Sequence, residues 1–398
     1  MTATLDQVPA SDVDLFSGKH LEDPYPDYKL IRDAAPVVHL SRFGVAALAR
    51  YQQVREAAEN WQTFSSAEGI SLNDGLNQAI IGHAVVATDP PYHDALRAVL
   101  NSRLAPRQVK KTSGDIVARA EELADQLVQR GSFDALTDCA HQFVPQFVLD
   151  RFGFPEEGSE HLLEWADQIF NCFAPPDNKK AQESVPGLEG MFGWLSTTCT
   201  RDRVKPGGFA DALYEAGERG DIKPESVVTM MSQYAIPGID TTLGLIGSAF
   251  YLFATNPDQW DLVREDPEER MRPALTEALR METPVQWFAR VLTQDYQTEG
   301  VTVPAGTRVM LLYAAANRDE RKYPDPDRFD VARDPMDHVA FGAGVHGCPG
   351  QHMALMQAGS LMTAFARRVR RFELAGQPRR SLNNATRLFV NLPVSVVT

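Results

Sequence analysis

The sequence predicts a mainly helical fold with a smaller β portion, built as one domain over residues 1–398. The first observation is a long middle region, residues 91–282, in which apolar side chains recur at helical spacing opposite charged faces. The second is that short β-type runs precede and follow this region. The third is the absence of an internal repeat, linker or low-complexity tract that would divide the chain.

The region before the helical middle has little regular periodicity. Residues 1–15 are polar and acidic, and we expect them to be disordered or loosely packed. Residues 37–40 and 44–49 are β-rich, whereas residues 65–90 combine Gly and Asn with no clear period and predict a long loop. A Pro-Pro pair then opens the first helix, because proline suits the first helical turn. The predicted helices cover residues 91–103, 107–130, 136–152, 159–174, 189–201, 224–256, 258–265 and 267–282.

The character of the chain changes again after residue 283. A coil rich in Pro, Asp and Arg is predicted over 317–336, and a glycine-rich loop over 341–350 opens a helix that extends to about residue 370. The end of the chain, residues 383–397, resembles a hairpin. The predicted strands of this part cover residues 285–292, 300–302 and 308–312.

Composition excludes several classes of protein. With 39 Lys and Arg against 53 Asp and Glu, the net charge is −14 at pH 7, which disfavours binding to nucleic acid or an anionic membrane. The N-terminus lacks the basic and apolar regions of a signal peptide, and the longest apolar run, residues 243–254, is shorter than the roughly 20 residues that span a bilayer. Four scattered cysteines do not form a disulfide framework. We therefore expect a cytoplasmic protein without nucleic-acid or membrane partners.

Cys348 is the cysteine with chemical potential. It lies in the loop Phe-Gly-Ala-Gly-Val-His-Gly-Cys-Pro-Gly, just before a predicted helix. Glycines let the backbone approach a flat group closely, and a helix N-terminus stabilises a thiolate, which is a soft ligand for iron. Two other interpretations are a small buried residue and a zinc site with His346 and His352, although no second ligand pair with zinc spacing exists in the chain.

The complete loop resembles the haem-binding signature of the cytochromes P450. The string Phe-Gly-x-Gly-x-His-x-Cys-x-Gly matches that signature at every fixed position, and the resemblance extends from about residue 20 to the end of the chain. It implies the single-domain P450 fold, bound haem b and monooxygenase activity with O2. It also implies that Cys348 is the axial ligand of the haem iron and that Phe341, Gly342 and Gly350 belong to the loop that binds the haem.

Two further groups of residues occur in the order that this family shows. Glu277 and Arg280 are spaced i, i+3 on a predicted helix, where such a pair is ordinarily a surface ion pair. The resemblance implies instead that the pair locks the fold together with an arginine of the later coil, for which Arg328 is the matching candidate. The residues that the resemblance assigns to the haem propionates are His93, Arg97, Arg290 and His346, and arginine suits a carboxylate because its planar fork donates two parallel hydrogen bonds.

Asp240 and Thr241 interrupt the long apolar helix. A polar acid–alcohol pair on a buried helix is costly unless it is satisfied or used, and an ordinary kink with Thr bonded to the backbone is the simpler interpretation. The resemblance makes the two residues the proton-delivery pair for oxygen activation. Pro237 departs from the small residue usual at its position, and it removes an N–H from the helix and leaves the carbonyl near Gln233 without its donor.

The substrate pocket is expected to be compact and aromatic. Contacts should come from residues 65–90, from the long helix and from further positions on three other segments, namely Phe170, Phe173, Val285, Phe288 and Phe389. Ordinary core packing is the alternative for each phenylalanine.

The sequence looks most similar to the bacterial P450 subgroup that oxidises para-substituted methoxybenzoates. That subgroup binds a carboxylate through a cation and hydroxyls of the loop before the His-x-x-x-Arg helix, yet no Lys or Arg occurs between Arg55 and Arg97 or between Lys223 and Arg264. Because a buried benzoate without a cation is costly, we expect hydroxylation or O-demethylation of a neutral methoxylated or alkylated aromatic such as a guaiacol-type phenol. The alternatives are a para-methoxybenzoate held by His83, Lys179 or Lys180, a terpene or macrolide, a peroxide-using haem enzyme and a haem-binding sensor.

Electrons should come from separate proteins, because the sequence contains no flavin or nicotinamide motif. The resemblance implies an acidic iron–sulfur ferredoxin with its own reductase, which meets basic residues on the cysteine side of the haem. Solvated faces are the ordinary interpretation of such basic clusters. The candidates are Arg103, Arg107, Lys110, Lys111, Arg367, Arg368, Arg370 and Arg371.

Overall fold

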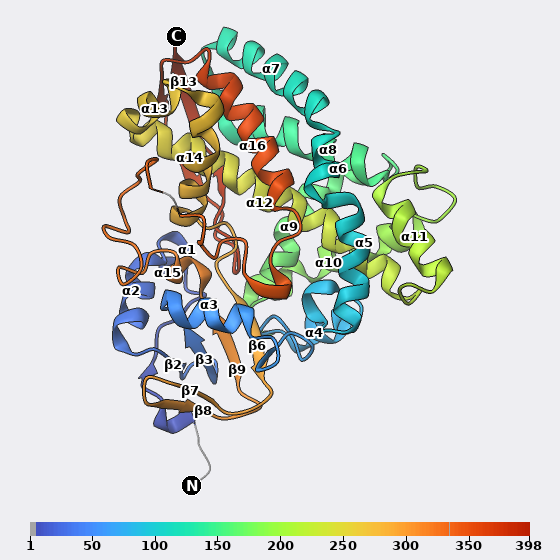
Figure 1. Cartoon of the computed structure of the whole chain (residues 1–398), viewed down its shortest axis with the longest axis vertical. Coiled ribbons are helices and arrows are strands. Elements are labelled where there is room, and N and C mark those ends of the chain that lie inside the picture. The colour runs from blue at the N-terminus through green and yellow to red at the C-terminus, as the bar shows by residue number, and fades with distance from the viewer. Residues whose placement is uncertain (1–4, 334) are drawn as a thin grey trace.

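A computed structural model describes residues 5–333 and 335–398. It confirms the predicted class, mainly α-helix with a smaller β portion. Figure 1 shows strands β2, β3, β6 and β9 gathered at one end of the molecule, whereas the long helices fill the rest and the C-terminus lies at the opposite end. The site therefore has to be sought where the helical body meets the sheet.

The helical body is made of amphipathic helices that bury one apolar face each. Its caps follow from the sequence, because Asn178 accepts a hydrogen bond from the Ala181 N–H at the start of α10 and Asp266 accepts one from Glu269 at the start of α14. The helices of this body are α5 (Tyr92–Leu104), α6 (Pro106–Lys110), α7 (Ser113–Arg130), α8 (His141–Phe152), α9 (Leu162–Asn171), α10 (Lys179–Thr197), α11 (Phe209–Arg219), α12 (Ser226–Thr255), α13 (Pro257–Arg264), α14 (Pro267–Met281) and α16 (Gln351–Ala366).

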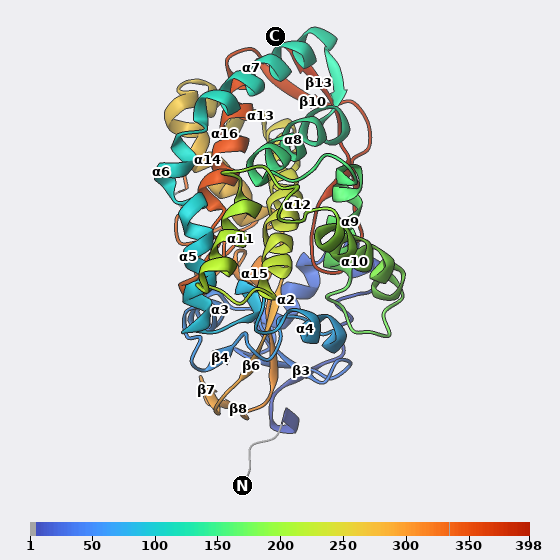
Figure 2. The ribbon, with the colours of Figure 1, turned by 90° about the vertical axis from the view of Figure 1, so that its right-hand side faces the viewer.

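Helix α12 is the axis of the body. It is long and apolar enough to cross a membrane, but 76% of its most apolar segment is buried inside the protein, as in a core helix. Figure 2 shows α5 and α11 on one side of α12 and α9 and α10 on the other. Pro237 lies inside this helix, as the sequence predicts.

A six-stranded mixed sheet with the order β1-β2-β3-β9-β6-β4 forms the β portion. Strand β3 pairs in parallel with β9, with Ala46 opposite Val309, and β9 pairs antiparallel with β6. Short helices cover this sheet, namely α1 (Gly18–Glu22), α2 (Tyr25–Ala34), α3 (Tyr51–Glu59) and α15 (Tyr313–Ala316). The strands are β1 (Ala10–Ser11), β2 (Val38–Leu40), β3 (Val45–Leu48), β4 (Phe64–Ser65), β5 (Ser132–Asp134), β6 (Phe288–Leu292), β7 (Tyr296–Thr298), β8 (Val301–Val303), β9 (Arg308–Leu311), β10 (Arg371–Leu374), β11 (Arg379–Arg380), β12 (Phe389–Asn391) and β13 (Pro393–Val397).

Three local expectations are wrong. The loop expected over 65–90 contains helix α4 (Asp74–Ile80), which Asn73 caps by accepting hydrogen bonds from Gly75 and Leu76. The hairpin expected over 383–397 does not form, because β12 pairs with β11 whereas β13 pairs with β10 and β5. The loose packing expected over 1–15 fails from Val8 onward: β1 pairs with β2, and Val8 and Leu15 are buried, whereas residues 1–4 lie outside the described part.

A buried ion-pair cluster joins α14 to the later coil. Arg280 donates two hydrogen bonds to Glu277, at 2.7 and 2.8 Å, and both side chains are fully buried. The third side chain is Arg333, whose Nε lies 3.2 Å from Glu277 Oε1. Arg328 was the sequence-based candidate, but it is exposed and contributes only its carbonyl oxygen, 3.5 Å from Arg280 Nη2. The coil bends after Phe329, so the arginine that returns to Glu277 lies five positions further on.

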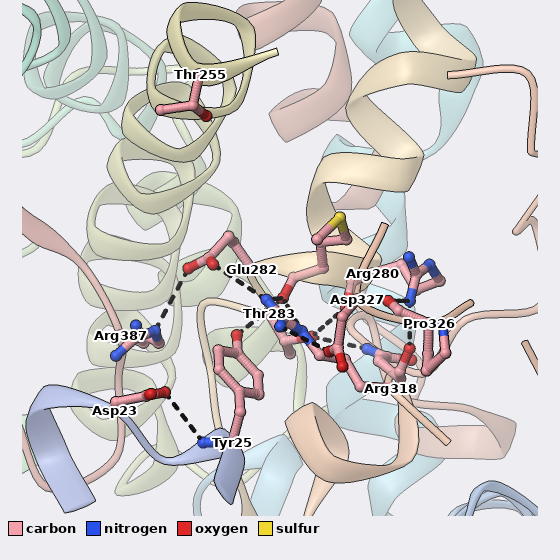
Figure 3. A network of polar contacts seen from close by, with 12 residues as sticks. Asp23, Tyr25, Thr255, Arg280, Glu282, Thr283, Arg318, Pro326, Asp327 and Arg387 are labelled. Carbon is pink, nitrogen blue, oxygen red and sulfur yellow. Dashed lines mark hydrogen bonds and ion pairs between the residues drawn. The ribbon is translucent and has the colours of Figure 1, made fainter. Parts of the chain in front are cut away.

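A second buried cluster surrounds Glu282, immediately after α14 (Figure 3). Three arginines approach its carboxylate: Arg380 at 2.9 Å, Arg318 at 3.2 Å and Arg387 at 3.4 Å. Tyr25 of α2 lies between two of them, with the Arg318 guanidinium 3.4 Å from its ring centre, and donates a hydrogen bond to the Met281 carbonyl. The cluster therefore connects the N-terminal helices, the end of α14 and the C-terminal strands.

Candidate functional site

The loop at 341–350 folds back on itself and presents Cys348 to the interior. The Cys348 N–H donates a 2.8 Å hydrogen bond to the Phe341 carbonyl, and Gly342 and Gly344 adopt left-handed backbone angles of φ 67° and 65°. Gly344 could not be replaced, since a Cβ atom there would lie 2.8 Å from the Ala58 carbonyl oxygen. Helix α16 begins at Gln351, so the thiol lies next to a helix N-terminus as predicted.

The environment of Cys348 acts on its pKa in two directions. Burial raises the pKa of the thiol, and the Gly350 and Gln351 amides and the Arg97 charge oppose this effect without cancelling it. The helix start alone therefore does not make a free thiolate, contrary to the expectation from the sequence. Iron would complete the deprotonation, because a coordinating thiol loses its proton.

Four basic side chains from three parts of the chain meet at one edge of the same cavity. They are His93 and Arg97 of α5, Arg290 of β6 and His346 of the cysteine loop. The His93 and His346 rings are 4.8 Å apart in an edge-to-face arrangement, and Arg97 donates a hydrogen bond to the Gly347 carbonyl. Burial lowers the pKa of His346 to about 4.

This edge fits a ligand with carboxylate groups. The Nε2 atoms of His93 and His346 are buried and have no hydrogen-bond partner among the described residues. Arg290 is 3% exposed, and the hydrogen bond given for its side chain goes to the adjacent Ala289 carbonyl. Buried donors of this kind are costly unless they are satisfied, and the two propionates of a haem whose iron is bound by Cys348 would satisfy them. The residues present therefore fit haem.

Asp240 and Thr241 lie on different sides of α12. Thr241 lines the cavity, and its Oγ1 donates a 2.6 Å hydrogen bond to the Pro237 carbonyl. Asp240 is absent from the described cavity lining, is 3% exposed, and its Oδ2 has no hydrogen-bond partner among the described residues. Burial raises the pKa of Asp240 well above its ordinary value, and the charge of Asp167 adds to this effect.

The cavity has a volume of about 610 Å³ and an aromatic wall. Four of the five predicted substrate contacts line it: Phe170, Phe173, Val285 and Phe288. The rings of Phe170 and Phe173 are 5.6 Å apart, and the Phe173 and Phe288 rings are 5.7 Å apart.

Phe389 is the exception among the predicted contacts. It is not part of the described lining, because its ring packs 5.1 Å from that of Tyr251, on the outer side of α12, under the Arg380 guanidinium. The failure has the same origin as the hairpin error, since β12 pairs with β11 rather than turning towards the cavity.

Sequence reasoning missed two groups of lining residues. Leu76 and Ile80 enter from α4, whose i, i+4 apolar spacing is a detectable but short helical signal. Leu188 and Phe192 enter from the first half of α10, which begins ten residues before the predicted start.

The alternative cations for a carboxylate substrate are engaged elsewhere. His83 Nδ1 lies 3.1 Å from Ser226 Oγ, Lys180 donates to the Leu382 carbonyl, and Lys179 pairs with Glu183 at the surface. None of the three belongs to the described cavity lining. The zinc interpretation of Cys348 has no support either, because residues 5–333 and 335–398 contain no group of three potential metal ligands.

The two basic clusters differ in their surroundings. Arg107, Lys110 and Lys111 of the α5–α6 region are exposed, and no ion pair is formed by them among the described residues. By contrast, Arg367 pairs with Glu121 and Glu268, and Arg368 pairs with Glu121 and Asp125. The second cluster is therefore largely neutralised.

Comparisons with known proteins agree with this geometry. The family model for cytochrome P450 matches residues 196–396. Cytochrome p450 CYP199A2 of Rhodopseudomonas palustris is 35% identical over 98% of this chain and 95% of that protein, and the vitamin D(3) 25-hydroxylase of Pseudonocardia autotrophica is 32% identical over 86% of each. The crystal structure of Mycobacterium marinum cytochrome P450 CYP268A2 in complex with pseudoionone has a TM-score of 0.86 at 24% identity, over 97% of this chain and 99% of that one, and it supports the fold alone.

Proposed function

Because the chain belongs to the cytochrome P450 family, we propose that it O-demethylates or hydroxylates a small, neutral, methoxylated or alkylated aromatic, with guaiacol-type phenols as the favoured class. The protein is a P450 monooxygenase and binds haem b. The substrate class, the electron donor, a single-domain organisation over 1–398 and a cytoplasmic location are the proposed parts.

Each residue of the cavity has a distinct task around the haem. Cys348 would hold the iron, and His93, Arg97, Arg290 and His346 would bind the propionates. When bound, haem supplies iron chemistry that inserts one atom of O2 into a C–H bond, assisted by electron donation from the thiolate. Thr241 holds a hydroxyl proton at the cavity wall, and Asp240 behind it holds a second proton.

The observation that carries the substrate class is the apolar wall near α9 and β6. Phe170, Phe173, Val285 and Phe288 line this wall, together with the aliphatic residues of α4. The charged residues of the described lining lie elsewhere: Arg97 and Arg290 at the propionate edge, and Arg103, Lys111, Asp150, Arg151 and Lys205 toward α6, α8 and the start of α11. A buried benzoate on the aromatic wall would have no cation, whereas a neutral aromatic ring would pack there without that cost.

O-demethylation follows from hydroxylation of the methoxy carbon. The product is a hemiacetal that separates into a phenol and formaldehyde, so the balance is ArOCH3 + O2 + 2 e− + 2 H+ → ArOH + CH2O + H2O. The phenylalanine wall would orient the ring, because aromatic pairs prefer edge-to-face or offset contacts.

The electron donor is proposed to be an acidic iron–sulfur ferredoxin served by a separate reductase. Support comes from the α5–α6 surface, where exposed Arg107, Lys110 and Lys111 are free of acidic partners in the described structure. The charge reversals Arg107→Glu and Lys110→Glu should slow reduction several-fold at low salt, since complementary charge mainly raises association rates. Arg370→Glu, in the neutralised cluster, is the matched control, and equal rates in all variants would contradict this docking site.

Ligand titration of the holoenzyme tests the substrate class. A 4-alkylguaiacol should shift the haem Soret band from the low-spin to the high-spin position and release formaldehyde with ferredoxin, reductase and reduced nicotinamide. 4-Methoxybenzoate should give a much weaker shift. A shift with the benzoate alone would overturn the neutral-substrate proposal, and formaldehyde release distinguishes an enzyme from a haem-binding sensor.

A further inference from the structure

Asp240 is a buried acid whose surroundings are given by α9 rather than by the cavity. Its side chain is 3% exposed, and its Oδ2 has no hydrogen-bond partner among the described residues. The charged side chain that acts on it is Asp167, one helix away on α9. A carboxyl group in this position, facing a carboxylate, is stable only with its proton in place.

Asp167 is arranged to remain an anion. Its Oδ1 accepts hydrogen bonds from Asn383 Nδ2 at 2.9 Å and Ser381 Oγ at 3.1 Å, and its Oδ2 accepts one from Asn171 Nδ2 at 3.1 Å. All three partners are neutral groups that act as donors, so the carboxylate form satisfies them without a proton of its own. Asp167 is also partly exposed, unlike Asp240, and can exchange protons with solvent.

The order of these groups across α12 defines a path. Asp167 lies on α9 at the outer side, Asp240 lies inside α12 away from the cavity, and Thr241 lies on the cavity side. Thr241 Oγ1 is bonded to the Pro237 carbonyl, so rotation about its side chain would turn the hydroxyl towards the cavity.

We propose that Asp167 is the port through which Asp240 regains its proton from solvent in each turnover. It rests on the monooxygenase activity described above but not on the identity of the substrate. Asp240 gives a proton through Thr241 to the reduced oxygen in the cavity and becomes a carboxylate. Two like charges then face each other in a buried space, and a proton taken from water by Asp167 and passed to Asp240 removes that repulsion. The two protons of the overall reaction, RH + O2 + 2 e− + 2 H+ → ROH + H2O, enter by this route, and the electrons come from the ferredoxin.

The other charges near this path lie beyond Asp167. Lys180 of α10 is influenced by Asp167 and Glu183, and burial lowers its pKa. Lys180 donates to the Leu382 carbonyl, in the segment that carries Ser381 and Asn383, so it holds the donors of Asp167 in place. Asp167 is therefore a positioning residue for proton delivery, and Lys180 supports it from the far side.

The test uses the holoenzyme and the variant Asp167→Asn, which keeps the shape and removes the charge. Infrared spectra of the resting enzyme report the C=O band of protonated Asp240, which is identified by its loss in Asp240→Asn. In Asp167→Asn this band should titrate at lower pH than in the wild type, since the like charge is gone. Turnover should fall about tenfold, with more hydrogen peroxide per electron pair and a larger solvent isotope effect.

Two variants complete the test. Asp167→Glu should restore the wild-type titration and coupling, whereas Glu164→Gln removes an exposed acid one turn earlier on α9 and should change neither. A thiolate-ligated carbon monoxide spectrum in each variant verifies the folded haem site. If Asp167→Asn leaves the Asp240 band, the coupling and the isotope effect unchanged, the proposal is overturned. Because the infrared band needs no substrate, failure of the guaiacol proposal is seen separately.

Discussion

Asp240 and Glu282 are both buried carboxyl groups, 3% and 5% exposed, yet their surroundings have opposite sign. Burial acts to raise the pKa of Glu282, but Arg380, Arg387 and Arg318 outweigh it and lower the pKa. Burial raises the pKa of Asp240, and Asp167 adds to the increase. The difference separates a structural from a functional acid: Glu282 is fixed as an ion by three cations, whereas Asp240 keeps a proton that it can transfer.

The largest expected effect comes from removing the structural ion. Glu282→Gln leaves three arginines without their buried counter-charge, and we expect a loss of about 3–5 kcal/mol in the free energy of unfolding by urea denaturation. Asp327→Asn removes the exposed partner of Arg318, 3.0 Å away, and should cost only about 0–1 kcal/mol. Equal losses in the two variants would mean that the buried carboxylate has no special role. If Glu282→Gln does not fold, Arg380→Gln gives a milder version of the same comparison.

The opposite result is expected for the functional acid. Asp240→Asn should reduce turnover by about 100-fold, because a positioned proton donor is lost, while the protein remains as stable as the wild type or becomes more stable. Steady-state product formation and urea denaturation measure the two effects. A loss of stability as large as that of Glu282→Gln would show that the two acids are not different in kind.

The buried Glu277 cluster provides a third reference point. Glu277 has two cationic partners, and Arg333→Gln removes one, with an expected loss of about 2 kcal/mol because a hydrogen bond to a buried charge disappears. Arg328→Gln changes an exposed side chain and should cost less than about 0.5 kcal/mol. Thermal and urea unfolding distinguish these variants, and a larger loss for Arg328→Gln would restore the original assignment.

The smallest effect is a difference in pH dependence. Because the pKa of Glu282 is below its ordinary value of 4.5 in the folded state, its stabilisation is present above that value and is lost as the pH falls through the folded pKa. For Asp240 the folded pKa lies above the ordinary 3.8, so stability decreases as the pH rises from about 3.8 to the folded value. Unfolding free energies of Glu282→Gln and Asp240→Asn relative to wild type should therefore change with pH in opposite directions. Parallel profiles would contradict the assignment of the two charge states.

The sequence was sufficient for the fold class and for the residues whose identity is set by local chemistry. Cys348, His93 and Thr241 lie in the predicted cavity because their motifs are continuous stretches with fixed spacing. Arg333 and Asp167 could not be found in this way, because each acts on a residue more than fifty positions away through the path of a coil or the packing of a helix. Phe389 failed for the same reason, since the pairing of β12 with β11 decides which way it faces.

The position of Tyr25 bears on how the chain is made. Its hydroxyl reaches a carbonyl 256 residues later, and Arg387 donates to the Glu22 carbonyl across 365 residues. A chain emerging from the ribosome N-terminus first cannot close these contacts until almost all of it has been synthesised. The first two helices must therefore wait, exposed, while the helical body forms, and the last strands complete the fold at both ends of the polypeptide at once. We expect nascent chains that stop before residue 387 to depend on chaperones more than full-length ones.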